Sequence, residues 1–174
     1  SALKEDAKES PKKTHSIKKT SEDIGLELEL KLIKALDSLP FYKQILHDIW
    51  VRRPNNKLCQ IDIVVLCCFG IFVIEAKNRA GKIIGDTEDW KWIQTIQNIK
   101  VDTFYNPIKQ NANHIKYLKE FIGGNYRFYS YIVFGEKATL VNKINVPTYT
   151  RIFKEDILAH SILSDISKKA KTLT

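Results

Sequence analysis

The sequence has no methionine, only three cysteines and no long uninterrupted apolar run. Without methionine, we expect the chain to have been cut or processed from a longer protein, and an upstream membrane anchor stays open. Cys67 and Cys68 are neighbours, which a disulfide framework would not use, and no histidine joins them at zinc spacing. They indicate reduced side chains in a cytoplasmic protein. The apolar stretch at residues 61–74 contains Asp62 and a turn, so it does not span a membrane.

The sequence also has no Gly-rich phosphate loop, no internal repeat and no credible Ser/His/Asp set. Its 174 residues are enough for one domain with a sizeable core. The net charge of +8 favours a polyanionic partner such as nucleic acid. Many proteins that touch no nucleic acid share this charge, so it only supports evidence from specific residues.

The most informative segment is a predicted β-hairpin at residues 59–77. Two β-branched, apolar runs flank a break at residues 68–70, which is a hairpin signal. A turn centred there places Asp62 opposite Glu75, and Gln60 opposite Lys77. Side chains alternate along a strand, so all four emerge on one face, and Ile61 belongs to the opposite, uncharged face with Ile63. Burying two carboxylates is costly unless they are paired or hold a metal, so a site is expected here.

Two carboxylates about 5 Å apart at their Cβ atoms can hold a hard cation such as Mg²⁺. Such an ion lowers the pKa of a bound water and neutralises charge on a phosphoryl group. Lys77 lies on the same face, where it could orient that water. The alternative is a structural Asp–Lys or Glu–Lys pair within the sheet.

A helix is predicted at residues 22–38, with Ser21 as its cap, after a flexible basic arm at residues 1–21. On a helical wheel, Glu29 lies within the apolar arc, whereas Glu27 lies opposite beside two lysines. Glu29 is therefore expected to reach the metal site. The alternative is a carboxylate that reaches the helix edge.

Further helices and strands are predicted from hydrophobic periodicity and from turn residues. Strands are predicted at residues 45–51, 82–85, 90–93, 128–134 and 148–152, and helices at 107–122 and 154–163, before a basic tail at 166–174. The 107–122 helix carries a polar stripe of amides, histidine and tyrosine at helical spacing: Asn106, Gln110, His114 and Tyr117. This stripe predicts either a solvated face or a set of site residues.

The predicted order is an αβββαβ core with a mixed central sheet flanked by helices, as in the restriction-endonuclease-like PD-(D/E)xK nucleases. More specifically, the chain resembles the nuclease-related domain (NERD) family across roughly residues 22–122, within a predicted domain at 22–165. The matching segments are residues 25–29, 60–65, 70–78, 81–85 with Trp90 or Trp92, and 106–111 with His114. One departure is Leu28, where the family usually has a small residue.

The resemblance implies a magnesium-dependent hydrolase that binds and cleaves DNA, with Mn²⁺ as a substitute metal. Asp62 and Glu75 would hold the ion together with the Ala76 carbonyl, Glu29 would support it, and Lys77 would orient the nucleophile. The residues expected to position phosphate or water are Gln60, Gln110, Asn106 and His114. A non-cleaving nucleic-acid-binding module and a regulatory or scaffolding domain remain alternatives, and an oligomer stays open.

Overall fold

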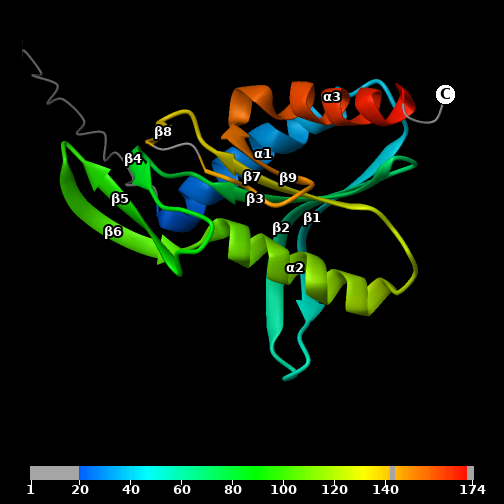
Figure 1. The fold of residues 1–174 in the computed structure, drawn as a ribbon, viewed down its shortest axis with the longest axis horizontal. Coiled ribbons are helices and arrows are strands. Elements are labelled where there is room, and N and C mark those ends of the chain that lie inside the picture. Colours follow the sequence, from blue (N-terminus) through cyan, green and yellow to red (C-terminus); the bar gives the residue numbers. More distant parts are fainter. Residues whose placement is uncertain (1–19, 142–143, 172–174) are drawn as a thin grey trace, which may run out of the picture.

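We describe residues 20–141 and 144–171 of a computed structural model of the chain. Residues 1–19 of the expected basic arm and residues 172–174 of the expected tail lie outside these ranges. The fold is α/β, and its larger sheet has the order β1-β2-β3-β7-β9 (Figure 1). β1, β2 and β3 are antiparallel, whereas β7 and β9 run parallel to β3. The strands of this sheet are β1 Lys43–Arg52, β2 Leu58–Cys67, β3 Gly70–Lys77, β7 Phe128–Phe134 and β9 Thr150–Lys154.

Helices cover both faces of this sheet. α1 (Ser21–Asp37) and α3 (Leu158–Lys171) pack against one face, and α2 (Pro107–Ile122) packs against the other. The expected mixed sheet flanked by helices is therefore confirmed. No helix in the described part of the chain has the length and apolar character needed to cross a membrane.

Two helix ends differ from the sequence predictions. α1 is capped by Thr20, not by Ser21: the Thr20 side chain accepts a hydrogen bond from the Asp23 backbone N–H, and the Asp23 carboxylate accepts one from the Thr20 backbone N–H. This reciprocal capping box satisfies two donors, whereas a cap at Ser21 would satisfy one. α3 follows a 3₁₀ turn at Glu155–Ile157 and continues to Lys171, so the tail expected at residues 166–174 is helical as far as it is described.

A second sheet is formed by three strands between β3 and α2 and by one strand after β7. Its order is β6-β5-β4-β8, with β4 Gly81–Ile84, β5 Lys91–Ile96, β6 Ile99–Tyr105 and β8 Ala138–Leu140. Trp92 is fully buried at its centre, stacked on Phe134 of the larger sheet. Gly85 leaves room for that indole, because a Cβ atom at Gly85 would lie 2.3 Å from the Trp92 ring. The two sheets therefore share an aromatic contact that depends on a glycine.

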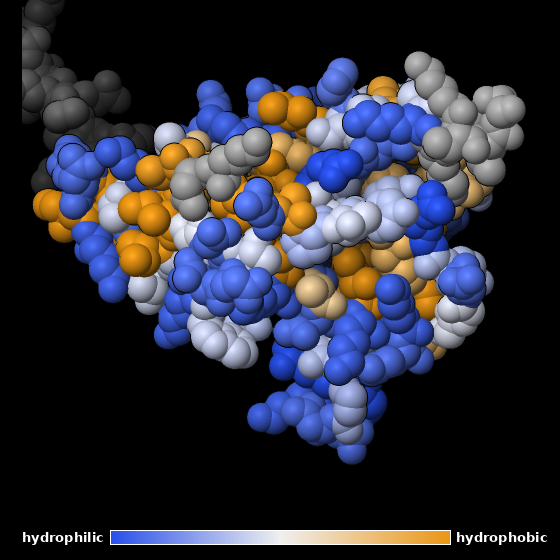
Figure 2. All heavy atoms as spheres, viewed as in Figure 1, coloured by the Kyte–Doolittle hydropathy of each residue, from blue (hydrophilic) through white to orange (hydrophobic). Residues whose placement is uncertain are grey.

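The β2–β3 hairpin has the predicted register from Cys67↔Gly70 to Ile63↔Ile74. The ladder then stops, while β1 and β2 stay paired as far as Arg52↔Leu58. Beyond that point β1 and β2 form a two-stranded projection, here called the β1–β2 arm, comprising residues 48–62 (Figure 1). Its tip is hydrophilic in Figure 2.

Both strands change faces where the arm begins. Ile63 packs on the α1 side of the sheet, but Ile61 packs on the α2 side with Val64, so the prediction that Ile61 shares a face with Ile63 is wrong. In β1, Asp48 has a φ of 52°, a left-handed conformation that interrupts regular alternation. A bend at the level of Asp48 and Asp62 therefore separates the arm from the rest of the sheet.

Candidate active site

Asp62 lies where β2 leaves β3. Its Oδ2 accepts a hydrogen bond from the backbone N–H of Ala76 at 2.8 Å, in place of a ladder bond between the strands. Burial raises the pKa of Asp62 to about 6, although the Ala76 hydrogen bond works in the opposite direction. The bend thus fixes one carboxylate beside the end of β3 that carries Glu75 and Lys77.

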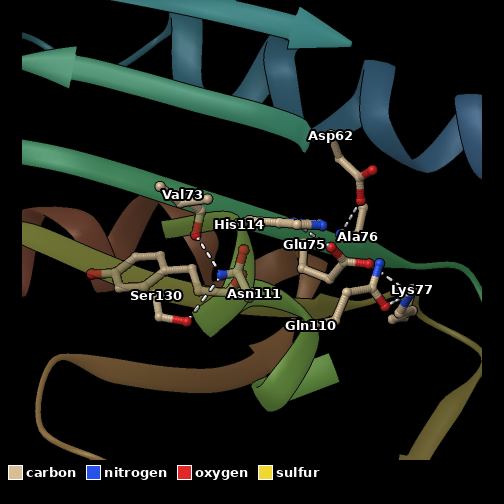
Figure 3. A network of polar contacts seen from close by, with 10 residues as sticks. Asp62, Val73, Glu75, Ala76, Lys77, Gln110, Asn111, His114 and Ser130 are labelled. Atoms are coloured by element: carbon tan, nitrogen blue, oxygen red, sulfur yellow. Dashed lines mark hydrogen bonds and ion pairs between the residues drawn. The ribbon is translucent and has the colours of Figure 1, made fainter. Parts of the chain in front are cut away.

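Glu75 is almost completely enclosed, with 1% of its surface exposed. Its Oε1 lies 2.6 Å from Lys77 Nζ, and its Oε2 has no hydrogen-bond partner among the described residues. Burial raises the pKa of Glu75 to about 7; Lys77 lowers it and Asp62 raises it. One oxygen is therefore paired with the base, and the other is left as a buried acceptor (Figure 3).

α2 brings two members of the polar stripe to this pair. Gln110 Oε1 accepts a hydrogen bond from Lys77 Nζ at 3.1 Å. His114 Nδ1 lies 3.3 Å from Glu75 Oε2 without forming a hydrogen bond. Burial lowers the pKa of His114 to about 4, with smaller contributions from Lys77 and Arg53, so the ring is neutral at pH 7. At these two positions the stripe faces the site, and the solvated-face alternative is wrong (Figure 3).

Asn106 is a structural cap and does not face the acids. Its Oδ1 accepts from the Ile108 backbone N–H, and its Nδ2 donates to the carbonyls of Asp86, Thr87 and Asp89. These bonds occupy both the oxygen and the nitrogen of the Asn106 side chain, which is fully buried. The expectation that Asn106 positions phosphate or water is therefore corrected, because the side chain holds the loop before β5 against α2.

Asn111 is a residue that the sequence analysis did not single out. It is fully buried, and its Nδ2 donates to the carbonyl of Val73 and to Ser130 Oγ, both at 2.9 Å (Figure 3). Asn111 thereby fixes α2 over β3 and β7, next to Gln110. The sequence shows an amide side chain at a position of α2 close to its apolar residues. It does not show that Val73 and Ser130 would be the hydrogen-bond partners of that amide.

Gln60 and Glu29 lie beside the site with partners of their own. Gln60 Nε2 donates to Asp48 Oδ1 at 2.7 Å, so the expected placement opposite Lys77 is wrong, because the ladder ends before this position. Glu29 Oε2 lies 2.6 Å from His47 Nε2. The negative charge of Glu29 contributes to raising the pKa values of Asp62 and Glu75. Glu29 therefore lies close enough to both acids to act on them through its charge.

Two hollows border the acids. A cavity of about 530 Å³ is lined by the arm, by α2 and by the end of β6: Arg53, Cys59, Gln60, Asp62, Tyr105, Gln110, Asn113, His114 and Tyr117. We call it the arm cavity. A second hollow of about 770 Å³ lies on the other side and includes Ala76, Lys77 and Arg79.

The possible metal ligands of the site are carboxylate oxygens, the ligand type that hard cations prefer. Within residues 20–141 and 144–171, no three Asp, Glu, His or Cys side chains converge closely enough to form a complete protein cage. Mg²⁺ does not require one, because it keeps several waters and uses one or two carboxylates. Asp62 and the free Oε2 of Glu75 are ligands of this type. The residues therefore fit a magnesium-like ion held by two carboxylates.

Comparisons with known proteins identify the family of the chain. The nuclease-related domain family matches residues 24–135. A protein of Bacillus anthracis described as uncharacterized is 33% identical over 122 residues, which cover 70% of this chain and 56% of the relative. This chain thus spans little more than half the length of that relative. No solved structure matches the chain. On the family match, which covers more than half of its length, the chain belongs to the nuclease-related domain family.

Proposed function

We propose that this domain is a divalent-metal-dependent nuclease that hydrolyses phosphodiester bonds, with DNA as its substrate. The observation that carries the proposal is the convergence of Glu75, Lys77 and Gln110 beside Asp62. A structural ion pair would need one acid and one base. Here a second buried carboxylate and an unpaired Glu75 oxygen accompany them, a combination that costs folding free energy and is typical of functional sites.

In this proposal Asp62 and Glu75 hold Mg²⁺ or Mn²⁺, with the Ala76 carbonyl as a further ligand. When bound, the ion supplies Lewis acidity and lowers the pKa of a coordinated water. Glu29 supports the metal-binding carboxylates through its charge and its contact with His47.

Lys77 places a fixed positive charge where negative charge develops on the phosphorus oxygens, and Gln110 holds the ammonium group in that position. Hydrolysis adds the oxygen of water to phosphorus and breaks one bridging P–O bond. The leaving alkoxide takes up a proton, and the water loses one. Neutral His114, facing Glu75 Oε2, fills the inner wall of the site beside the acids.

The test is cleavage of labelled single-stranded, duplex and branched DNA in Mg²⁺, Mn²⁺ or EDTA. We expect cleavage with either metal and none in EDTA. Asp62→Asn and Glu75→Gln should each lose it, whereas Glu120→Gln, on the exposed side of α2, should retain it. If the parent cleaves no substrate with either metal, the nuclease proposal fails. If cleavage persists in both acid variants, another site is responsible.

A further inference from the structure

The arm cavity is lined by Asp62, one of the two acids of the proposed site, together with an unusual set of side chains. Among its lining residues Arg53 is the single Lys or Arg, and the others include two tyrosines and three amide side chains. Duplex DNA is bound mainly through many Lys and Arg contacts to phosphates. Single strands are bound by a positively charged groove combined with aromatic side chains on which the bases stack. The lining of the arm cavity offers one guanidinium and two aromatic rings, which suits a short stretch of single strand better than a duplex.

Arg53 is a cation without an acidic partner. Its guanidinium lies 5.8 Å from the centre of the Tyr117 ring, and its buried Nε has no hydrogen-bond partner among the described residues. No described carboxylate lies within ion-pair distance of it. Its charge contributes to lowering the pKa of His114, which places it near the acids. An unpaired guanidinium here is suited to a phosphate group.

An aromatic platform continues from the rim of the cavity. Tyr105 lines the cavity and is 37% exposed, and the Trp90 ring centre lies 6.5 Å from that of Tyr105. Trp90 is 72% exposed, and Lys109 Nζ lies 4.9 Å from its ring centre. Exposed apolar side chains that lie next to each other are more informative than single ones, because contiguous apolar surface is typical of interaction sites. Two adjacent exposed rings offer stacking surfaces for successive bases.

The hollow on the other side of the acids is less suited to a polyanion. Arg79 pairs with Asp102 at 2.7 Å, and Lys31 pairs with Glu155 at 3.6 Å. These carboxylates line the same hollow as Lys77, so most of its cations are already neutralised. The arm cavity is therefore the better path for a nucleic acid strand.

We propose that the arm cavity binds unpaired nucleotides of a single DNA strand. Arg53 contacts a phosphate, and the bases stack on Tyr105 and Trp90 as the strand leaves the cavity. Intact duplex is disfavoured, because a cavity of about 530 Å³ is of the size of small-molecule sites and Glu75, which contacts His114 of its lining, is almost completely buried. The proposal rests on the proposed function for its substrate class, but it does not require that cleavage occurs.

Binding should be measured by fluorescence anisotropy in EDTA, where affinity is independent of metal. The probes are a labelled single strand, the blunt duplex of the same sequence and that duplex with an unpaired overhang. We expect the single strand and the overhang to bind at least about tenfold more tightly than the blunt duplex. Tyr105→Ala, Trp90→Ala and Arg53→Ala should each weaken single-strand binding about tenfold and leave duplex binding nearly unchanged.

Control variants outside the arm cavity show whether a loss of binding is specific to the cavity. Tyr42→Ala and Phe121→Ala remove exposed aromatic rings outside the cavity, and Arg52→Ala removes the neighbouring exposed guanidinium. These variants should bind like the parent. Circular dichroism and thermal melting of every variant show whether a loss of binding reflects unfolding. Arg53→Lys keeps the charge without the planar group, so partial binding in that variant supports a phosphate contact.

The outcomes separate this inference from the nuclease proposal. Equal binding of single strand and blunt duplex, or equal losses in the control variants, overturns the single-strand inference even if the protein cleaves DNA. Selective single-strand binding that depends on Tyr105, Trp90 and Arg53 supports it even if no metal restores cleavage. In that case the nuclease proposal alone fails.

Discussion

Lys77 Nζ lies 2.6 Å from Glu75 Oε1, so the base of the site and its most buried acid share one ion pair. Lys77→Ala should abolish most metal-dependent cleavage and leave DNA affinity within a few-fold of the parent, because the lysine is expected to act mainly in the transition state. The measurement is single-turnover cleavage alongside binding in EDTA. Lys116→Ala, on the exposed side of α2, is the matched control.

Loss of Lys77 also removes the largest influence that lowers the pKa of Glu75. The assay therefore needs alkaline pH and saturating Mn²⁺, so that a protonated Glu75 is not mistaken for a missing catalytic group. Cleavage by Lys77→Ala at the parent's rate under these conditions would remove Lys77 from the mechanism.

Asp62 makes the metal-free protein sensitive to pH. The pKa of Asp62 is raised from 3.8 to about 6, so the folded state holds this proton more tightly than the unfolded state. The resulting stabilisation is complete below pH 3.8 and is lost as the pH rises through 6. Asp62→Asn keeps an acceptor for Ala76, and its stability relative to the parent should increase by about 1 kcal/mol between pH 5 and pH 8.

Urea unfolding in EDTA at several pH values measures this difference. Asp37→Asn, an exposed carboxylate at the end of α1, should give a much flatter difference. Added Mn²⁺ should stabilise the parent and not Asp62→Asn, because the ion binds only the folded site. A constant difference between parent and Asp62→Asn across this range would mean that Asp62 titrates normally.

Glu29 is expected to act on the metal through its position beside the acids. Glu29→Gln should weaken Mn²⁺ binding about tenfold, the size of effect typical of outer-shell partners. Glu27→Gln, two residues away on the exposed side of α1, should have little effect. Isothermal titration calorimetry measures both. If the two variants bind Mn²⁺ equally well, the role of Glu29 is confined to its contact with His47.

Gly85 should tolerate no side chain. A Cβ atom there would lie 2.3 Å from the Trp92 ring, so Gly85→Ala should lower the free energy of unfolding by about 1–3 kcal/mol. Gly25 lies within α1 with nothing within 4 Å of an added Cβ, so Gly25→Ala should raise it by about 0.5–1 kcal/mol. Urea unfolding compares them, and equal effects would contradict the packing argument.

The sequence predicted the parts of the fold that depend on local alternation. The β2–β3 register followed from two apolar runs and a short turn as far as Ile63↔Ile74, but Asp62 lies beyond the end of this ladder and accepts a hydrogen bond from Ala76. What it missed depends on tertiary contacts. The bend at Asp48 and Asp62 ends the ladder and redirects Gln60, and no local pattern distinguishes it from a regular strand.

The second sheet shows the same limit. β6 alternates β-branched with charged residues, a strand signal that the sequence analysis did not use, whereas β8 has three residues and is too short to give one. In the sequence, Arg53 belonged to a predicted polar turn. Its position over the Tyr117 ring depends on the projection of the β1–β2 arm. Asn106 and His114 lay in one helical stripe, yet one is a cap and the other faces Glu75.

The contact of Asn111 with Ser130 has a consequence for the order of folding. β3 is completed as a central strand only by parallel pairing with β7, more than fifty residues later in the chain. Such long-range parallel contacts form slowly, because a large loop must close before they are made. During synthesis, the acids and the base of β3 emerge well before the strand that fixes α2 over them. A ribosome-bound chain that ends before Ser130 should therefore lack an ordered site.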